Sequence, residues 1–311
     1  MAAILVFLLA LAGCDIGSEP TPTAAPTTTA APTLLPTLTP TPSPTATPIP
    51  GRSDLYSPIM PPEHMAYIWW EWSADKSEFE SLVIDFTIHN DVGDFSRRHG
   101  LYMMLGFSHI AGVPFYFGLQ TNVNDPAVGP RGKGLIFSRW ETRGLADARV
   151  ADPVEGWTES SGHEGDFIGG RRSYEWGAGD YRVRIAPDGS DEGGQWFGMW
   201  ITDKATGETT WAGSIRFPYQ NGRAAISSPV YSTMEIYGAP IRPIDIPEWH
   251  VSVARPLGDG AKPTRGVTGF QAFSIEILNS DAWYDRTEDV LHFQAGGLIQ
   301  RTNLPGEILF D

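Results

Sequence analysis

Residues 180–185 read Asp180-Tyr181-Arg182-Val183-Arg184-Ile185, so apolar and charged side chains alternate without interruption. Successive side chains of a β-strand point to opposite faces, whereas a helix repeats every 3.6 residues. The period of two therefore predicts a strand with Tyr181, Val183 and Ile185 facing a core and both arginines facing water. Such a pattern is typical of an antiparallel sheet with one solvated face.

The neighbouring segments extend this pattern in two ways. Residues 82–88 alternate in the same manner, whereas residues 196–201 would make both faces of a strand apolar. We expect the second segment to be a central strand, or a strand whose outer face carries a function. Residues 187–194 and 203–207 supply the glycines that tight hairpin connections need.

Short apolar or alternating runs separated by Gly, Pro, Asp and Asn continue through the chain, which is typical of a sandwich. We expect roughly fourteen strands and no helix of note. The sequence thus predicts an all-β fold, an antiparallel β-sandwich of the jelly-roll, lectin- or glucanase-like kind. The clearest strands are 66–72, 81–88, 100–108, 115–120, 135–140, 181–186, 195–202, 210–217, 232–237, 249–254, 269–278 and 290–293.

Composition excludes other classes of protein. The 311 residues include 34 Gly and 11 Trp and lack helical apolar repeats, which excludes a helical bundle. The formal net charge is −15, and the first fifty residues contain no basic residue and only two acids. An acidic surface repels phosphate backbones and anionic headgroups, so nucleic acid is excluded as a partner.

The N-terminus carries an export address. Residues 3–13 form an apolar run that is long enough for a signal-peptide core and too short for a transmembrane helix. The run ends in Leu11-Ala12-Gly13-Cys14, which resembles the lipobox of bacterial lipoproteins. Cys14 is the only cysteine, so it has no partner for an internal disulfide. We therefore predict a lipoprotein signal peptide at 1–14, with Cys14 lipidated and the protein anchored on the extracellular face of the bacterial membrane.

A linker separates this address from the folded part. Between Pro20 and Pro50, ten Pro and eleven Thr occupy 21 of 31 positions without one charge. This composition cannot bury a core, and frequent prolines favour an extended polyproline II chain. We predict a disordered stalk at 15–52 and one sandwich domain at 53–311, with a separate lobe after Ile246 left open.

Several short motifs between residues 115 and 218 resemble a family of secreted bacterial proteins known only as a domain of unknown function. They include Tyr116-Phe117-Gly118-Leu119-Gln120 and Ile136-Phe137-Ser138-Arg139-Trp140. A Gly-rich acidic turn at 162–170, segments at 174–176 and 179–182 and a closing strand at 211–218 follow in the family's order. The resemblance implies an extracellular β-rich domain, often found beside carbohydrate-related modules, and implies no activity or catalytic residue.

Aromatic side chains are the first candidates for binding. Sugar rings stack on flat indoles, so an exposed tryptophan on a sandwich face suits a glycan. We take Trp70, Trp72, Trp140 and Trp176 as ligand-binding candidates, with Gln120 at the end of the first family motif. The alternative is that most of these tryptophans form the core.

The Gly-rich turn supplies acidic candidates. Glu164 and Asp166 can accept sugar hydroxyls, act as acid or base, or bind Ca²⁺, which prefers oxygen ligands. The alternative is that they cap the turn beside Arg171 and Arg172. The strand motif of sandwich glucanases, E-x-D-x-x-E, is absent because Gly169 stands where the third acid belongs.

Other catalytic and metal motifs are missing from the sequence. The histidines stand at 64, 89, 99, 109, 163, 250 and 292 without a metal-ligand spacing, so the sequence predicts no zinc site. Carboxylates at 71, 85, 175 and 235 remain candidates for a pair formed across strands.

The function predicted from sequence is glycan or cell-surface recognition without catalysis by a lipid-anchored protein. The expected partners are membrane lipid at Cys14 and a polysaccharide or other cell-surface ligand, with no cofactor except a possible Ca²⁺. One alternative is a polysaccharide hydrolase or lyase that uses Glu164 or Asp166. Another is a structural or protein-interaction module of the envelope.

Overall fold

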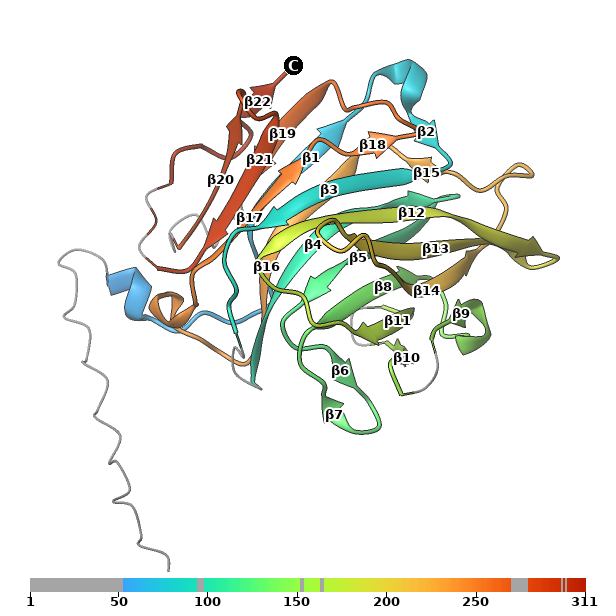
Figure 1. Cartoon of the computed structure of the whole chain (residues 1–311), viewed down its shortest axis with the longest axis horizontal. Helices are drawn as coiled ribbons and strands as arrows, with labels where there is room; N and C mark the ends of the chain where they lie inside the picture. The colour runs from blue at the N-terminus through green and yellow to red at the C-terminus, as the bar shows by residue number, and fades with distance from the viewer. Residues whose placement is uncertain are drawn as a thin grey trace, which may run out of the picture. The chain divides into compact units, whose positions relative to one another are not determined.

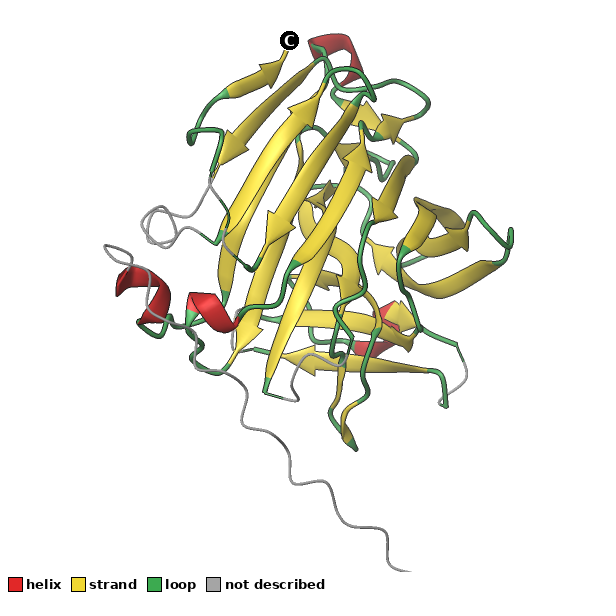
Figure 2. Cartoon of the chain, turned by 60° about the vertical axis from the view of Figure 1, so that its left-hand side comes forward, coloured by secondary structure: helices red, strands yellow, loops and turns green. Residues whose placement is uncertain are grey.

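The computed structural model describes residues 53–93, 98–151, 154–162, 165–269, 279–297, 299 and 301–311. Strands dominate this part of the chain, and its helices are short 3-10 turns (Figure 2). None of these turns has the length or the apolar composition of a membrane span. The all-β class predicted from sequence is therefore confirmed. The helical turns are η1 (Ser53–Tyr56), η2 (Ala74–Lys76), η3 (Leu145–Asp147) and η4 (Pro243–Asp245).

Two antiparallel sheets stack on one another (Figure 1). The first sheet has eleven strands, and short β15 (Ile226–Ser227) and β2 (Glu78–Phe79) extend it beside β4. Its order is β10 (Gly156–Ser161), β11 (Phe167–Ser173), β8 (Gly134–Trp140), β5 (Val113–Gln120), β4 (His99–Ile110), β16 (Val230–Gly238), β1 (Glu63–Glu71), β19 (Arg265–Gly269) and β22 (Ile308–Phe310).

The second sheet has nine strands, of which short β18 (Leu257–Gly258) pairs with β3. A separate two-stranded hairpin joins β6 (Asn124–Asp125) to β7 (Gly129–Pro130). The order of the second sheet is β20 (Ser280–Asp285), β21 (Val290–Ala295), β17 (Trp249–Ala254), β3 (Leu82–Ile88), β12 (Gly179–Asp191), β13 (Gly194–Asp203), β14 (Thr209–Phe217) and β9 (Ala148–Arg149).

Strand β12 shows why these residues form a sandwich. Tyr181, Val183 and Ile185 are buried, whereas Arg182 and Arg184 are exposed, as their alternation predicts. Each inward side chain removes apolar surface from water, at roughly 25 cal/mol per Å². Side chains from both sheets meet in one core. For example, the ring of Phe115 on β5 in the first sheet lies 5.9 Å from the ring of Phe217 on β14 in the second.

The C-terminal segment belongs to the same sandwich. Strands β17, β20 and β21 pair within the second sheet, and β19 and β22 pair within the first. Residues Pro48–Asp311 form one compact unit, so no separate lobe begins after Ile246. Of the strand expected at 269–278, only Gly269 is described, where it ends β19. The predicted signal peptide, Cys14 and the whole of the predicted stalk lie outside the described residues.

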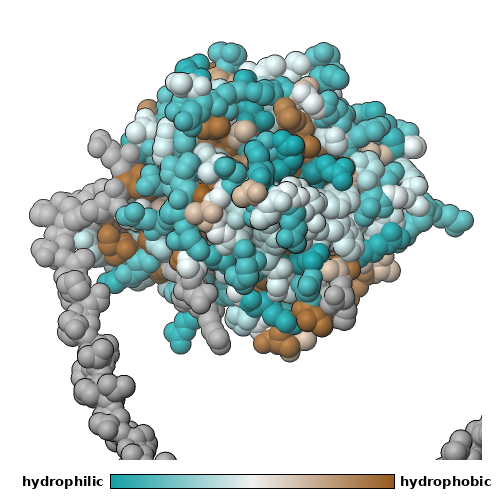
Figure 3. Space-filling model, viewed as in Figure 1, coloured by the Kyte–Doolittle hydropathy of each residue, from teal (hydrophilic) through white to brown (hydrophobic). Residues whose placement is uncertain are grey.

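Residues 196–201, which are apolar on both faces, lie in strand β13 of the second sheet. Strand β13 is central, between β12 and β14, as predicted. Its outward tryptophans are covered by arginines: Arg149 lies 3.7 Å over the ring of Trp196 and Arg184 lies 4.3 Å over that of Trp200. The surface on this side is largely hydrophilic or neutral (Figure 3).

Candidate functional site

The outer face of the first sheet is apolar, in contrast to that of the second. In β4, Leu101, Met103 and Leu105 point into the sandwich, so the alternate residues Tyr102 and Met104 point outward. They belong to a second apolar cluster on the outer face, separate from the core. Its buried members are Tyr102, Met104, Tyr116, Ile136 and Tyr231, and Tyr67, Trp69, Phe107, Trp140 and Tyr237 pack against them.

Strand register aligns the residues of this face into rows. One row crosses β5, β4, β16 and β1, and a second crosses β10, β11, β8, β5, β4, β16 and β1. Because paired residues face the same side of a sheet, each row presents one line of side chains to the outside. The first row is Gln120, Tyr102, Glu235 and His64, and the second is Glu159, Gly169, Ser138, Tyr116, Phe107, Tyr231 and Trp69.

Residues from both rows line a cleft of about 630 Å³. Its walls come from β1, β4, β5, β8, β10, β11 and β16, and Pro61, Pro62, Asn122 and Asn124 also line it. Two glycines make it possible. A Cβ on Gly118 would meet the Met103 carbonyl, and a Cβ on Gly169 would meet the guanidinium of Arg171. Glycine at these positions therefore leaves room for the side chains that form the cleft.

One end of the cleft carries a buried ion pair. Nη2 of Arg171 on β11 lies 3.2 Å from a carboxylate oxygen of Glu159 on β10. Nη1 of Arg171 also donates a hydrogen bond of 2.7 Å to the hydroxyl of Ser138. The guanidinium is only 5% exposed, so these partners fix it in place. Planar donors and a carboxylate therefore stand side by side in fixed positions.

The other end carries a histidine held between two groups. Nδ1 of His64 lies 2.6 Å from the hydroxyl of Tyr231, and Nε2 lies 3.3 Å from a carboxylate oxygen of Glu235. Burial raises the pKa of Tyr231 well above its usual range, so this phenol stays protonated. The ring of His64 is thus oriented by one neighbour on each side.

Tyr102 lies between these two ends. Its side chain is 2% exposed, and its hydroxyl has no hydrogen-bond partner among the residues that the structure describes. Burial, reinforced by Tyr116 and Glu235, raises its pKa well above the usual range. A buried hydroxyl without a partner is costly, typically about 1–3 kcal/mol. Because the hydroxyl is buried, a polar ligand in the cleft would supply that partner only after neighbouring side chains move aside.

Trp140 forms an aromatic wall of the cleft. Its ring lies 4.7 Å from that of Tyr116 and 5.7 Å from that of Phe107, and it stays partly exposed. Gln120 also lines the cleft. Two residues proposed from sequence as ligand-binding candidates, Trp140 and Gln120, are therefore brought together here.

The other tryptophan candidates lie elsewhere. Trp70 is fully buried and donates to Ser232, and Trp72 is 7% exposed and donates to the Ala261 carbonyl. Trp176 is 1% exposed and stacks on Trp249, with ring centres 5.4 Å apart. All three indoles belong to the buried core cluster. We correct the prediction for Trp70, Trp72 and Trp176, because a ligand cannot reach their faces.

Asp166 is not among the described residues that line the cleft. Asp166 is exposed and lies 4.0 Å from Arg143, and Glu164 lies outside the described residues. Of the carboxylates considered as a cross-strand pair, Glu71 binds Arg265 and Asp85 binds Arg182, each at 2.6 Å. Only Glu235 of that set reaches the cleft.

Four residues of the cleft were missed by sequence reasoning in this role: Tyr102, Glu159, Arg171 and His64. Residues 100–108 are apolar on both faces, which is the signal that marked residues 196–201. That signal was available for Tyr102. The charged residues gave no comparable signal, because their proximity depends on strand register.

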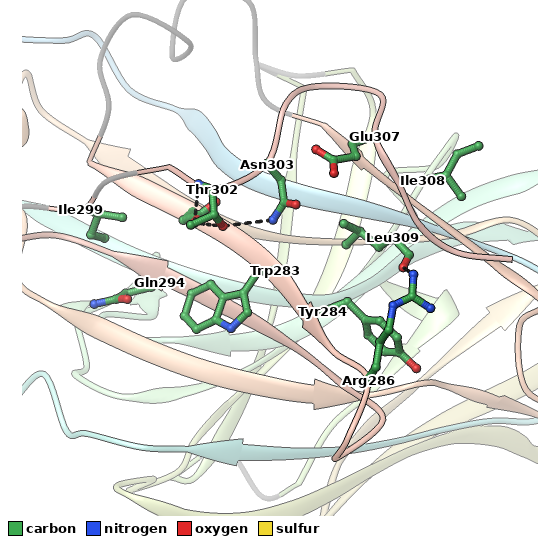
Figure 4. A pocket seen from close by; sticks show the side chains of 11 residues that line it. Trp283, Tyr284, Arg286, Gln294, Ile299, Thr302, Asn303, Glu307, Ile308 and Leu309 are labelled. Carbon is green, nitrogen blue, oxygen red and sulfur yellow. Dashed lines mark hydrogen bonds between the residues drawn. The ribbon is translucent and has the colours of Figure 1, made fainter.

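A second cavity, of about 650 Å³, lies beside β20 and β21 (Figure 4). Its polar groups are engaged within the protein. Asp281 accepts hydrogen bonds from Thr302, the amide of Asn303 donates to the Ala282 carbonyl, and Arg286 donates to the Leu309 carbonyl. The cleft on the first sheet is the better site, because Tyr102 there lacks a partner among the described residues.

Three histidines converge on the outer face of the second sheet. Ligand nitrogens of His89, His250 and His292 all lie within 4.8 Å of one another. Sequence spacing gave no support for a metal site here, because pairing of β3, β17 and β21 gathers histidines that lie far apart in the chain.

No protein family model matches the chain, and no curated protein is significantly similar to it. The resemblance to a secreted family of unknown function therefore stays a prediction.

Proposed function

We propose that this protein is a lipid-anchored surface protein that binds a glycan in the cleft on the outer face of the first sheet, without catalysis. The observation that carries this is the combination of an aromatic wall with fixed polar groups. Trp140 and Tyr116 offer flat apolar faces, and Glu159, Arg171 and Glu235 stand around them. A sugar ring presents C–H faces and hydroxyls, which match these two kinds of group.

The buried hydroxyl of Tyr102 supports the same proposal. A sugar hydroxyl placed over the centre of the first row would pair with it and relieve its desolvation. A purely apolar ligand could not form hydrogen bonds with the hydroxyl of Tyr102 or with the carboxylates of Glu159 and Glu235. The cleft therefore favours a ligand with many hydroxyls over a lipid chain.

Location at the cell surface rests on the sequence. The apolar run, Cys14 and the Thr/Pro-rich linker are consistent with a domain held away from a membrane. The acidic surface of the protein favours neutral or cationic ligands over polyanions.

A glycan array tests the proposal with the full chain, first in Ca²⁺ and then in chelator. We expect selective binding, which Trp140→Ala weakens at least tenfold, or about 1.4 kcal/mol. Trp200→Ala is the matched control, because Trp200 lies on the outer face of the other sheet. A blank array, or equal losses in the two variants, would contradict the proposal and favour a structural or protein-contact role. Loss of binding in chelator would show that binding requires Ca²⁺, for which Glu164 and Asp166 are the candidate ligands.

Catalysis is the second candidate, since Glu159 and Glu235 line one cleft. Glycoside hydrolysis needs two carboxylates on either side of the scissile bond. If incubation with the bound glycan produces new reducing or unsaturated ends, and Glu235→Gln abolishes them, the protein is an enzyme and the proposal of binding without catalysis is wrong. Turnover abolished by Glu164→Gln instead would place it at the acidic turn.

A further inference from the structure

The three-histidine cluster is built from outward positions of adjacent strands. His250 and Ser252 alternate with buried Val251 and Val253 on β17, so both point outward. His292 pairs with Ser252 in register, and His89 follows directly after β3 on the neighbouring side. The three side chains therefore meet over the centre of β17.

The rings are held closely together. His89 stacks on His250 with ring centres 4.0 Å apart, and Nε2 of His250 lies 2.9 Å from Nδ1 of His292. The hydroxyl of Ser252 lies 2.9 Å from Nε2 of His89 and orients that ring. Outer contacts of this kind orient histidine ligands in metal sites.

Trp283 covers one side of the cluster. Its ring stacks on His292 at 4.8 Å and on His250 at 5.6 Å. His292 is 9% exposed, whereas His89 is exposed, so the cluster is shielded from below and open on one side.

We propose that His89, His250 and His292 form a binding site for a divalent transition metal, with copper(II) as its preferred ion. The 2.9 Å contact between Nε2 of His250 and Nδ1 of His292 is a hydrogen bond, which a bound metal would replace with two metal–nitrogen bonds. Nitrogen ligands bind copper(II) more tightly than zinc(II) in the general order of the divalent first-row metals. The open side leaves room for water or another ligand.

Copper(II) titration of the full chain tests this proposal. A Cys14→Ser background removes the only thiol, which would otherwise react with the metal. We expect one tightly bound copper(II) per chain, nitrogen hyperfine structure in the electron paramagnetic resonance spectrum, and weaker binding of zinc(II). We expect Ca²⁺ not to compete, because it prefers oxygen ligands.

Variants assign the site. His250→Ala and His89→Ala should each weaken copper(II) binding at least 100-fold and remove the nitrogen signal. His109→Ala on β4 is the control and should bind as the parent does. His89 is exposed, so His89→Ala keeps the test valid if His250→Ala fails to fold. Copper(II) binding that survives both cluster variants, falls equally in the control, or is weaker than zinc(II) binding overturns the proposal.

Discussion

The guanidinium of Arg171 lies 3.2 Å from the carboxylate of Glu159 at one end of the cleft, and the two come from adjacent strands. Removing one partner of a buried ion pair leaves an uncompensated charge, whereas removing both need not. We expect Glu159→Ala to lower the free energy of unfolding by about 3 kcal/mol. The double variant Glu159→Ala/Arg171→Met should recover part of this loss. Urea denaturation of the parent, Glu159→Ala, Arg171→Met and the double variant measures the coupling, and strictly additive losses would contradict a direct interaction.

A Trp176 variant distinguishes the role of a core tryptophan from that of a tryptophan in the cleft. Trp176 is buried against Trp249, and Nζ of Lys133 lies 4.6 Å over its ring. Trp176→Ala should destabilise the fold by about 3–5 kcal/mol through the cavity it leaves. The fraction that remains folded should bind the glycan with unchanged affinity. Calorimetry at a temperature where the variant is folded checks this, and a specific loss of affinity would return Trp176 to the candidate site.

Glu63 makes stability depend on pH. Burial raises its pKa from 4.5 to about 7, so the folded protein holds a proton that the unfolded chain has released between these values. The contribution of the protonated Glu63 to the free energy of unfolding is fully present below about pH 4.5 and is lost as pH rises toward 7. Glu63→Gln should therefore stabilise the protein by about 2 kcal/mol above pH 7 and have little effect at pH 4. Thermal unfolding of both proteins across this range gives the difference, and a gain that does not vary with pH would rule out titration of Glu63.

Asp289 responds to acid in the opposite direction. Burial opposes its ionisation, but hydrogen bonds from Arg255, Lys262 and Tyr284 outweigh burial and hold its pKa well below the usual range. The stability it contributes is present at neutral pH and is lost as pH falls through that low pKa. We expect Asp289→Asn to cost about 1 kcal/mol at pH 7, because the site is partly exposed.

Asparagine suits this test because residue 289 has a φ of 58°, a conformation that asparagine tolerates. Any loss then reports the charge and not the backbone. Chemical denaturation at pH 7 and at pH 3 should show a smaller difference between the two proteins in acid. An equal difference at both values would show that the loss has another origin.

The clearest sequence signals were local. Alternation in residues 180–185 predicted the two faces of β12, and the turn segment 203–207 with Gly207 predicted the hairpin between β13 and β14, because both depend on backbone geometry within a few residues. Trp70 and Trp72 share a face by the same rule, but the rule could not say that this face is the core. The strands of Trp140 and Gln120 were predicted, whereas the row joining Gln120 to Tyr102, Glu235 and His64 was not.

The sequence by itself determined the class of fold, most of the longer strands and the acidic composition, since period-two patterning, turn residues and charge count act over short distances or over the whole chain. It did not predict β10, β11 or β20. Tertiary structure decided which outer face is apolar, how Glu159 and Arg171 meet Glu235 and His64 around one cleft, and how His89 reaches His250 and His292. These relationships depend on strand order and register. They are fixed only when the two sheets pack and bury a common core.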